Sequence, residues 1–120
     1  MRFLLIQVEG DKRTAIQTML ERAGHQTTVS TVRKEVESLA RDCDAVLLNP
    51  DELPDMDFAF VWSLRMKGVQ TPLMLVTEAD IWSGKLITLA THADDSVMMP
   101  ISEARLLGRI LLMAARPLWI

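Results

Sequence analysis

Residues 44–57 read DAVLLNPDELPDMD, and this stretch gives the clearest indication of the fold. Its first part, AVLLN at residues 45–49, has four consecutive apolar residues, as in a strand that is buried on both faces. The proline and the acidic residues that follow are typical of a loop, so the strand ends near Asn49. Strands buried on both faces are characteristic of a parallel sheet that is covered by helices.

Four further runs along the chain have the length and composition of strands. RFLLIQV (2–8), PLMLVT (72–77) and SVMMP (96–100) are mostly apolar and therefore predict further buried strands. HQTTVS (25–30) contains more polar residues and alternates, which is typical of a strand at the edge of a sheet.

Patterns with helical period lie between these runs and follow the last one. Regular alternation of strands and helices predicts a parallel sheet with helices on both faces, because each right-handed crossover covers one face. We therefore expect an α/β, flavodoxin-like (βα)5 doubly wound sheet with strand order 2-1-3-4-5. The five apolar stripes are Ala15–Ile16–Met19–Leu20–Ala23, Val32–Val36–Leu39–Ala40, Phe58–Val61–Trp62–Leu64, Ile81–Leu86–Leu89–Ala90 and Leu106–Leu107–Ile110–Leu111–Met113.

Length and composition predict one soluble domain. We expect a single domain over residues 1–116, with 117–120 as the start of an interdomain linker or a truncated C-terminus. A net charge of −3 gives no general reason to bind nucleic acid, and no apolar run is long enough to cross a membrane. The single cysteine, Cys43, cannot form an internal disulfide, which fits a reducing compartment, so we expect the protein to be cytoplasmic.

The sheet also predicts where a site would lie. In open parallel sheets, ligands bind beyond the carboxyl ends of the strands. The residues expected at those ends are Val8, Glu9, Asn49, Thr77, Glu78 and Met99.

Several motifs together resemble one known family. They are RFLLIQVE, DAVLLN followed by ELPDMD, LRMKGVQTPLMLVT and, above all, HADDSVMMPISEARLLGRI. In this order and spacing they resemble the receiver domain of response regulators, especially the OmpR/PhoB type and its CtrA-like relatives, over residues 2–116. The resemblance implies the N-terminal domain of a bacterial transcription regulator, so any DNA would be bound by a domain outside these 120 residues.

The resemblance also implies a chemistry against which this chain can be compared. Receiver domains accept a phosphoryl group on an aspartate that ends the third strand. An acidic pair after the first strand holds magnesium, a Ser or Thr ends the fourth strand, and a lysine ends the fifth. The metal and the lysine neutralise the charge that develops on the phosphoryl oxygens.

This chain departs from that pattern at most of these positions. The acidic pair corresponds to Val8 and Glu9, the phosphoacceptor to Asn49 and the lysine to Met99, while the Ser/Thr position is retained as Thr77. An amide is a poor nucleophile and cannot form an acyl phosphate. The sequence therefore predicts a pseudo-receiver with no catalytic residue, no metal, no cofactor and no small-molecule substrate.

Other interpretations remain open at this stage. An alignment without a gap would place Pro50 at the phosphoacceptor position. A receiver that is still phosphorylated would have to combine Glu9 with Asp51 or Asp55. Glu78 is either a solvated loop carboxylate or a group that fills the former phosphate space. A phosphate-binding enzyme of the same fold is disfavoured, because the loop VEGDKRT after the first strand contains one glycine only.

The resemblance further implies a homodimer through the fourth helix, fifth strand and fifth helix. Asp95 and Arg109 match a family pair that forms between two subunits. A second family pair retains its basic half as Lys85, but its acidic half corresponds to Arg105. Two alternatives follow: either Glu103 or Asp94 compensates for the lost acidic half, or the interface is shifted toward Trp82 and Leu86.

Overall fold

The computed structural model describes residues 1–6, 11–30, 33–49, 58–77 and 93–115. All five predicted strands form, although each strand is one or two residues shorter than the run that predicted it. The strands are β1 (Arg2–Ile6), β2 (Gln26–Ser30), β3 (Ala45–Leu48), β4 (Leu73–Thr77) and β5 (Asp95–Met98), and the helices are α1 (Asp11–Arg22), α2 (Arg33–Arg41), α3 (Phe58–Met66) and α5 (Glu103–Ala114).

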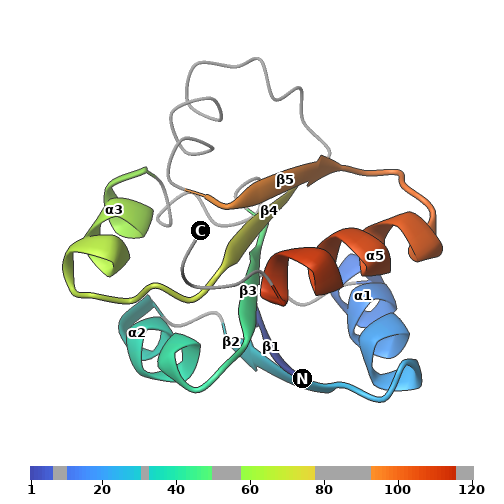
Figure 1. Ribbon diagram of the computed structural model, residues 1–120, viewed down its shortest axis with the longest axis horizontal. Helices are drawn as coiled ribbons and strands as arrows, with labels where there is room; N and C mark the ends of the chain where they lie inside the picture. Colours follow the sequence, from blue (N-terminus) through green and yellow to red (C-terminus); the bar gives the residue numbers. More distant parts are fainter. Residues whose placement is uncertain (7–10, 31–32, 50–57, 78–92, 116–120) are drawn as a thin grey trace.

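The strands form one parallel sheet in the order β2-β1-β3-β4-β5, which confirms the flavodoxin-like prediction. In Figure 1 the sheet passes through the centre of the molecule, with α2 and α3 on one side and α1 and α5 on the other. The more polar strand β2 lies at one edge, as its sequence predicts, and β5 lies at the other edge.

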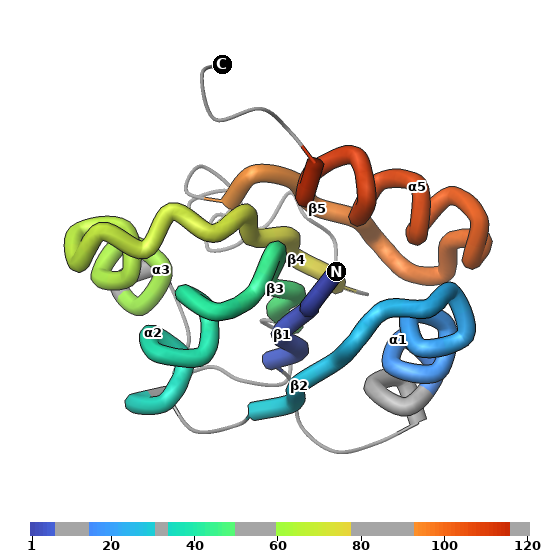
Figure 2. The backbone as a smooth tube through the Cα atoms, turned by 60° about the horizontal axis from the view of Figure 1, so that its bottom comes forward, coloured from blue at the N-terminus to red at the C-terminus, as the bar shows by residue number. Residues whose placement is uncertain are grey.

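Alternation along the strands divides the apolar side chains between two cores. In β1, Leu4 and Ile6 belong to the core under α2 and α3, while Phe3 and Leu5 belong to the core under α1 and α5. All four of these side chains are buried. Figure 2, which looks more nearly along the strands, shows the two helical layers that cover these cores. β1 is apolar from Phe3 to Ile6 because both of its faces are buried.

Helix ends follow the local sequence signals. Gly24 and Gly68, which follow α1 and α3, have φ of 90° and 85°, a backbone conformation that residues with a Cβ rarely adopt. At the start of α5, the Ser102 hydroxyl accepts a hydrogen bond from the Arg105 backbone N–H at 3.3 Å. Ser102 is therefore the N-cap of α5.

The amino ends of the strands are joined by side chains that bond to the backbone. Arg65 in α3 donates to the carbonyl oxygens of Val69 and Thr71, both at 2.9 Å, and to the Asp94 carboxylate at 2.9 Å. Asp94 also accepts a hydrogen bond from the Leu73 N–H at 2.9 Å. One partly buried ion pair therefore joins the end of α3 to the starts of β4 and β5.

Two sequence predictions fall outside the described residues. The fourth apolar stripe, Ile81–Leu86–Leu89–Ala90, belongs to residues 78–92, and the predicted boundary near residue 116 follows the last described residue.

Candidate functional site

Asn49 lies at the carboxyl end of β3, directly after four buried apolar residues. Its side chain is only 4% exposed, and its backbone N–H donates to the Ile6 carbonyl at 3.1 Å, so the backbone pairing of β1 and β3 continues to this residue. The predicted position of the amide at the end of a central strand is therefore confirmed.

Thr77 and Met99 lie at the same edge of the sheet, on the next two strands. Thr77 is the last residue of β4 and is 2% exposed, and its carbonyl accepts a hydrogen bond from the Met99 N–H at 2.7 Å. The Met99 side chain is half-buried and packs against the core under α1 and α5. The peptide bond between Met99 and Pro100 is cis.

These three residues bring an amide, a hydroxyl and a thioether to the ends of three neighbouring strands. None of the three carries a charge, and a thioether packed against an apolar core cannot neutralise a phosphoryl oxygen as an ammonium group does. The remaining predicted site residues, Val8, Glu9 and Glu78, lie outside the described residues, as do Pro50, Asp51 and Asp55.

The predicted interface residues Asp95 and Arg109 contact each other within one chain. Arg109 donates from Nε to Asp95 Oδ2 at 3.2 Å and from Nη2 to Oδ1 at 2.5 Å. The Asp95 carboxylate also accepts a hydrogen bond from the Ser96 N–H. The pair thus fixes α5 against β5 in a single subunit, and its reciprocal contact between two subunits stays a prediction.

The other predicted interface residues have separate surroundings. The Asp94 carboxylate forms an ion pair with Arg65 and accepts a hydrogen bond from the Leu73 N–H, so both of these contacts lie within one chain. Arg105 is exposed on α5, and Lys85 lies outside the described residues. Glu103 lies 3.7 Å from Arg22 of α1, with both side chains 68% exposed, which makes a weak surface pair.

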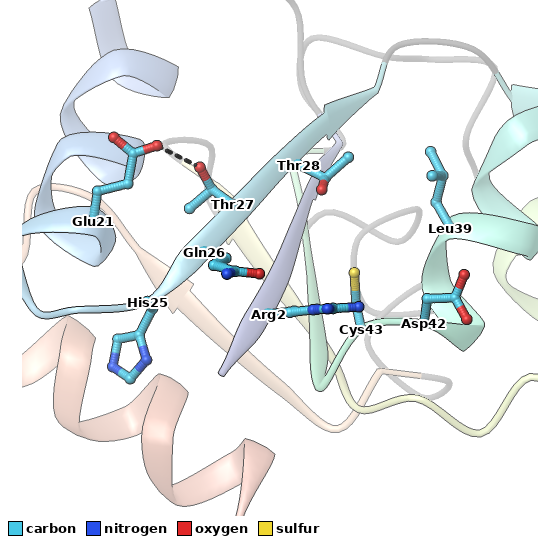
Figure 3. A pocket seen from close by; sticks show the side chains of 9 residues that line it. All are labelled: Arg2, Glu21, His25, Gln26, Thr27, Thr28, Leu39, Asp42 and Cys43. Atoms are coloured by element: carbon cyan, nitrogen blue, oxygen red, sulfur yellow. Dashed lines mark hydrogen bonds between the residues drawn. The ribbon is translucent and has the colours of Figure 1, made fainter.

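A cavity at the opposite end of the sheet was not predicted from the sequence. It has a volume of about 580 Å³ and lies beside the edge strand β2. Figure 3 shows the side chains that line it, which come from the end of α1, from the starts of β1 and β2, and from the end of α2 and the turn that follows it. They are Arg2, Glu21, His25, Gln26, Thr27, Thr28, Leu39, Asp42 and Cys43.

Two of these lining residues have environments that the sequence did not indicate. The His25 ring packs edge-on against the Phe3 ring, with 5.3 Å between the two ring centroids. This histidine is half-buried. Burial raises the pKa of the Cys43 thiol, and the neighbouring Asp44 and Asp42 carboxylates raise it further. A thiol with a raised pKa is a weak nucleophile at neutral pH, so Cys43 is poorly suited to nucleophilic chemistry.

The described residues contain neither a metal-binding cluster nor a membrane-spanning helix. Within residues 1–6, 11–30, 33–49, 58–77 and 93–115, no group of three His, Cys, Asp or Glu side chains is arranged to hold a metal ion. None of the helices in these same ranges has the length and apolar character needed to span a bilayer.

Comparison with known proteins agrees with the fold. No family model matches the chain. The chain is 30% identical over 113 residues to the cell cycle transcriptional regulator CtrA of Caulobacter vibrioides, with 92% of this chain and 48% of that protein covered. The same similarity is found for CtrA from a second strain of this species. The chain therefore spans about half the length of the curated relatives it matches.

Solved receiver domains superpose on almost the whole chain. The BeF3-activated N-terminal receiver domain of Klebsiella pneumoniae RstA superposes with a TM-score of 0.82 at 20% identity, covering 97% of this chain and all of that domain. The receiver domain of the sensor histidine kinase PA1611 from Pseudomonas aeruginosa, which holds magnesium in its active-site cleft, gives a TM-score of 0.78 at 21% identity, covering 96% of this chain and 98% of that domain. This chain has the fold of these domains.

Proposed function

We propose that this chain is a response-regulator receiver domain that works without phosphorylation, as a protein-interaction module. The fold, the similarity to CtrA and the order of the strand-end residues all support this family. The observation that carries the proposal is the buried Asn49 at the end of β3, where a phosphorylated receiver has its aspartate. An amide oxygen does not attack a phosphoryl group at a useful rate.

The surroundings of Asn49 support the same conclusion. Phosphoryl transfer needs positive charge opposite the equatorial oxygens, usually from a metal ion and a lysine. Met99 occupies the position of that lysine, and its half-buried side chain packs into an apolar core. Asn49 and Thr77 contribute only neutral oxygens, whereas magnesium in proteins usually relies on at least one carboxylate.

A mass measurement tests the loss of phosphorylation. The protein is incubated with acetyl phosphate and Mg²⁺, and its intact mass is recorded; we expect no addition of about 80 Da, the mass of one phosphoryl group. A stable adduct would overturn the proposal and favour phosphorylation at a non-standard acidic site. The variants Asp51→Asn and Asp55→Asn would then identify which carboxylate, together with Glu9, accepts the group.

Reconstruction of the site gives a second, independent test. We expect Asn49→Asp alone to remain inactive, because the new carboxylate has no lysine to balance it. The combined variant Val8→Asp, Asn49→Asp, Met99→Lys restores the family pattern and should label with acetyl phosphate. Rapid labelling of the single variant would contradict this reasoning.

We further propose that this domain regulates a DNA-binding transcription factor. The support is the similarity to CtrA, of which this chain matches about half. With a net charge of −3, these 120 residues have no general electrostatic attraction to DNA, so a separate domain would bind it. The full reading frame beyond Ile120 tests this, since a DNA-binding domain should follow in the gene.

The proposed interaction is a homodimer through the fourth helix, β5 and α5. Exposed ion pairs contribute only about 0–1 kcal/mol each, so apolar contacts must supply most of the stability of such a dimer. Leu112 on α5 and Met98 at the end of β5 are 76% and 53% exposed, which leaves apolar surface on these elements. Sedimentation at micromolar concentration measures the dimer directly.

Charge reversal tests whether Asp95 and Arg109 take part in this dimer. Each single reversal, Arg109→Glu or Asp95→Arg, breaks the pair, and the double reversal restores it. If the pair also bridges two subunits, we expect dimerisation to fall in each single variant and to recover in the double variant. A dimer that is unchanged in all three would show that the pair acts within the subunit only.

A further inference from the structure

The two edge strands of the sheet differ in how their outer edges are protected. Natural sheets usually protect an edge with charged side chains, proline, a bulge or a covering element, because unpaired backbone groups attract another strand. β5 begins with Asp95, which forms an ion pair with Arg109. β2 has the sequence QTTVS and contains no charged residue, no proline and no glycine. Among the described residues no strand pairs with its outer edge, which is therefore open to pairing.

The backbone of β2 presents a defined set of groups at this edge. The Gln26 N–H donates to the Met1 carbonyl at 2.9 Å, so Gln26 is directed toward β1. Because the direction alternates along a strand, Thr28 and Ser30 are directed toward β1 as well, and Thr27 and Val29 are directed away from it. The free edge thus carries the N–H and C=O groups of Thr27 and Val29.

Side-chain hydrogen bonds hold β2 in place on one of its two faces. On the α1 face, the Thr27 hydroxyl donates to Glu21 at 2.9 Å and accepts from Gln17 at 3.1 Å. On the other face, Thr28 is directed toward Leu39 of α2, as Figure 3 shows. Residues from both faces of β2 line the cavity of about 580 Å³. The hydrogen bonds of Thr27 and the pairing with β1 already restrict the conformation of this strand. Such preorganisation lowers the entropic cost of adding another strand.

We propose that β2 pairs with β2 of a second copy of this chain, antiparallel about a twofold axis at Thr28. In this register Thr27 lies opposite Val29 of the second copy, and Val29 lies opposite its Thr27. Residues that both point outward exchange two hydrogen bonds when they are opposite each other, so the two pairs form four bonds. A shift by one residue would direct outward groups against inward ones, and it is therefore excluded.

The composition of β2 favours a second copy of the chain as the partner. Thr28 lies opposite Thr28 of the second copy, and Thr–Thr pairs across strands are favourable. No like charges meet along the strand, because Gln26–Ser30 contains none. The residues flanking the strand carry both signs, with Glu21 and Asp42 acidic and Arg2 basic, so two identical surfaces can approach each other.

The resulting dimer is expected to be weak and distinct from the one proposed above. Pairing through one strand buries less area than a standard stable interface, so association should depend on concentration in the measurable range. β2 and β5 are at opposite edges of the sheet, so a substitution at one edge leaves the other intact. Failure of either dimer is therefore distinguishable from failure of the other.

Cysteine cross-linking tests the register. In a Cys43→Ala background, Thr28→Cys places two thiols on the twofold axis, whereas Gln26→Cys places them about 14 Å apart, beyond the reach of a disulfide. Thr28 and Gln26 are both exposed on the same strand, so the variants are matched. We expect a covalent dimer from Thr28→Cys under mild oxidation and little from Gln26→Cys. Equal cross-linking of the two, or none from Thr28→Cys, would overturn the proposal.

Added charge provides a second measurement that does not need covalent capture. Thr28→Lys places two like charges opposite each other, and Gln26→Lys adds the same charge opposite Ser30 of the second copy. We expect Thr28→Lys to weaken dimerisation roughly tenfold in sedimentation, with much less change in Gln26→Lys. Thermal unfolding of both variants at low concentration should match, as a control for folding. A Thr28→Lys dimer as strong as that of the unmodified chain would contradict the proposed contact.

Discussion

The two ends of the parallel sheet differ in the polar residues that they carry: charged at the amino ends of the strands, uncharged among the described residues at the carboxyl ends. At the amino ends, charged side chains bond to one another and to the backbone: Arg65 bonds to Asp94 and to two carbonyls, and the Arg2 N–H donates to the Asp44 carboxylate at 2.7 Å. At the carboxyl ends, the described residues Asn49, Thr77 and Met99 are uncharged and at least half-buried.

This difference separates the charges that hold the fold from those that a phosphorylated receiver would need for its reaction. Removing Arg65 would take the cationic donor away from a partly buried carboxylate and from two carbonyls, which is costly. Replacing a site carboxylate by an amide leaves no such group behind. A chain that no longer transfers phosphate can therefore lose charge at the carboxyl end while it keeps charge at the amino end.

The largest effect is expected from Arg65→Ala. The side chains of Arg65 and Asp94 are 23% and 21% exposed, so the pair is largely shielded from solvent. We expect a loss of roughly 3 kcal/mol in the free energy of unfolding, because Asp94 and two carbonyls lose their donor. Urea unfolding measures this loss.

Asp94→Asn is the matched variant for this ion pair. The amide oxygen can still accept from the Leu73 N–H, but the charge is lost, so we expect a smaller effect than in Arg65→Ala. A change below about 1 kcal/mol in Arg65→Ala would show that solvent replaces the pair and that the amino end depends on packing alone.

A smaller effect, dependent on pH, is expected from Asn49→Asp at the other end of the sheet. Burial raises the pKa of a carboxyl group in the folded state above its value of about 4 in the unfolded chain. The folded state then holds its proton more tightly, so the penalty is greatest at neutral pH and disappears as the pH falls below about 4. We expect a loss of about 1–3 kcal/mol at pH 7 relative to the unmodified chain.

Asn49→Ala is the control for this pH dependence. It removes the side chain without adding charge, so its difference from the unmodified chain should not vary with pH. A loss in Asn49→Asp that is equally independent of pH would mean that cations near this position compensate the new charge.

We expect Glu37→Gln to lower the free energy of unfolding by less than about 1 kcal/mol, in contrast to the larger loss expected from Arg65→Ala. Glu37 lies 3.3 Å from Arg41 and 3.6 Å from Lys67, but all three side chains are between 38% and 57% exposed. Exposed ion pairs contribute about 0–1 kcal/mol, because water screens them. Urea unfolding that gave losses as large as those of Arg65→Ala would show that burial does not separate the two classes of ion pair.

The smallest change concerns the reactivity of Cys43 at the amino end. Its pKa is raised by burial and then by Asp44 and Asp42, so the thiolate forms only at more alkaline pH than in a free cysteine. We expect slower alkylation by iodoacetamide at pH 8 than for a small thiol, and a faster reaction in Asp42→Asn. Stability linked to this group is present below the pKa of the unfolded thiol and falls as the pH rises above it. Alkylation as fast as that of a free thiol would contradict the assigned environment.

Much of the candidate site could be predicted from the chain alone, because it depends on local pattern. A continuous apolar run such as AVLL must be buried on both faces, and the residue that ends it must lie at the carboxyl edge of a parallel sheet. Asn49, Thr77 and Met99 were located in this way, and the structure confirms their positions. Gly24 and Gly68 likewise mark the C-terminal ends of α1 and α3, and Ser102 marks the N-terminal start of α5.

Contacts between distant charged residues could not be predicted in this way. The Asp95 carboxylate contacts Arg109 of the same chain, 14 residues away, whereas the sequence predicts this pair only between subunits, where it stays a prediction. Asp94 directly precedes Asp95 in the sequence, but its carboxylate bonds to Arg65, 29 residues away. Long charged side chains have many rotamers, and which partner each reaches depends on how the helices pack on the sheet.

The strand order, the two apolar cores and the uncharged residues at the ends of β3, β4 and β5 can all be predicted from local patterns in the chain. The physical reason is that burial follows periodicity and the chemistry of a side chain follows its identity. The packing of the helices and strands determines which charges pair, and which backbone groups of β2 have no strand partner among the described residues. The outer groups of β2 have no strand beside them because β2 is the outermost of the described strands. The ion pairs form because packing brings Arg65 of α3 close to Asp94 and Arg109 of α5 close to Asp95.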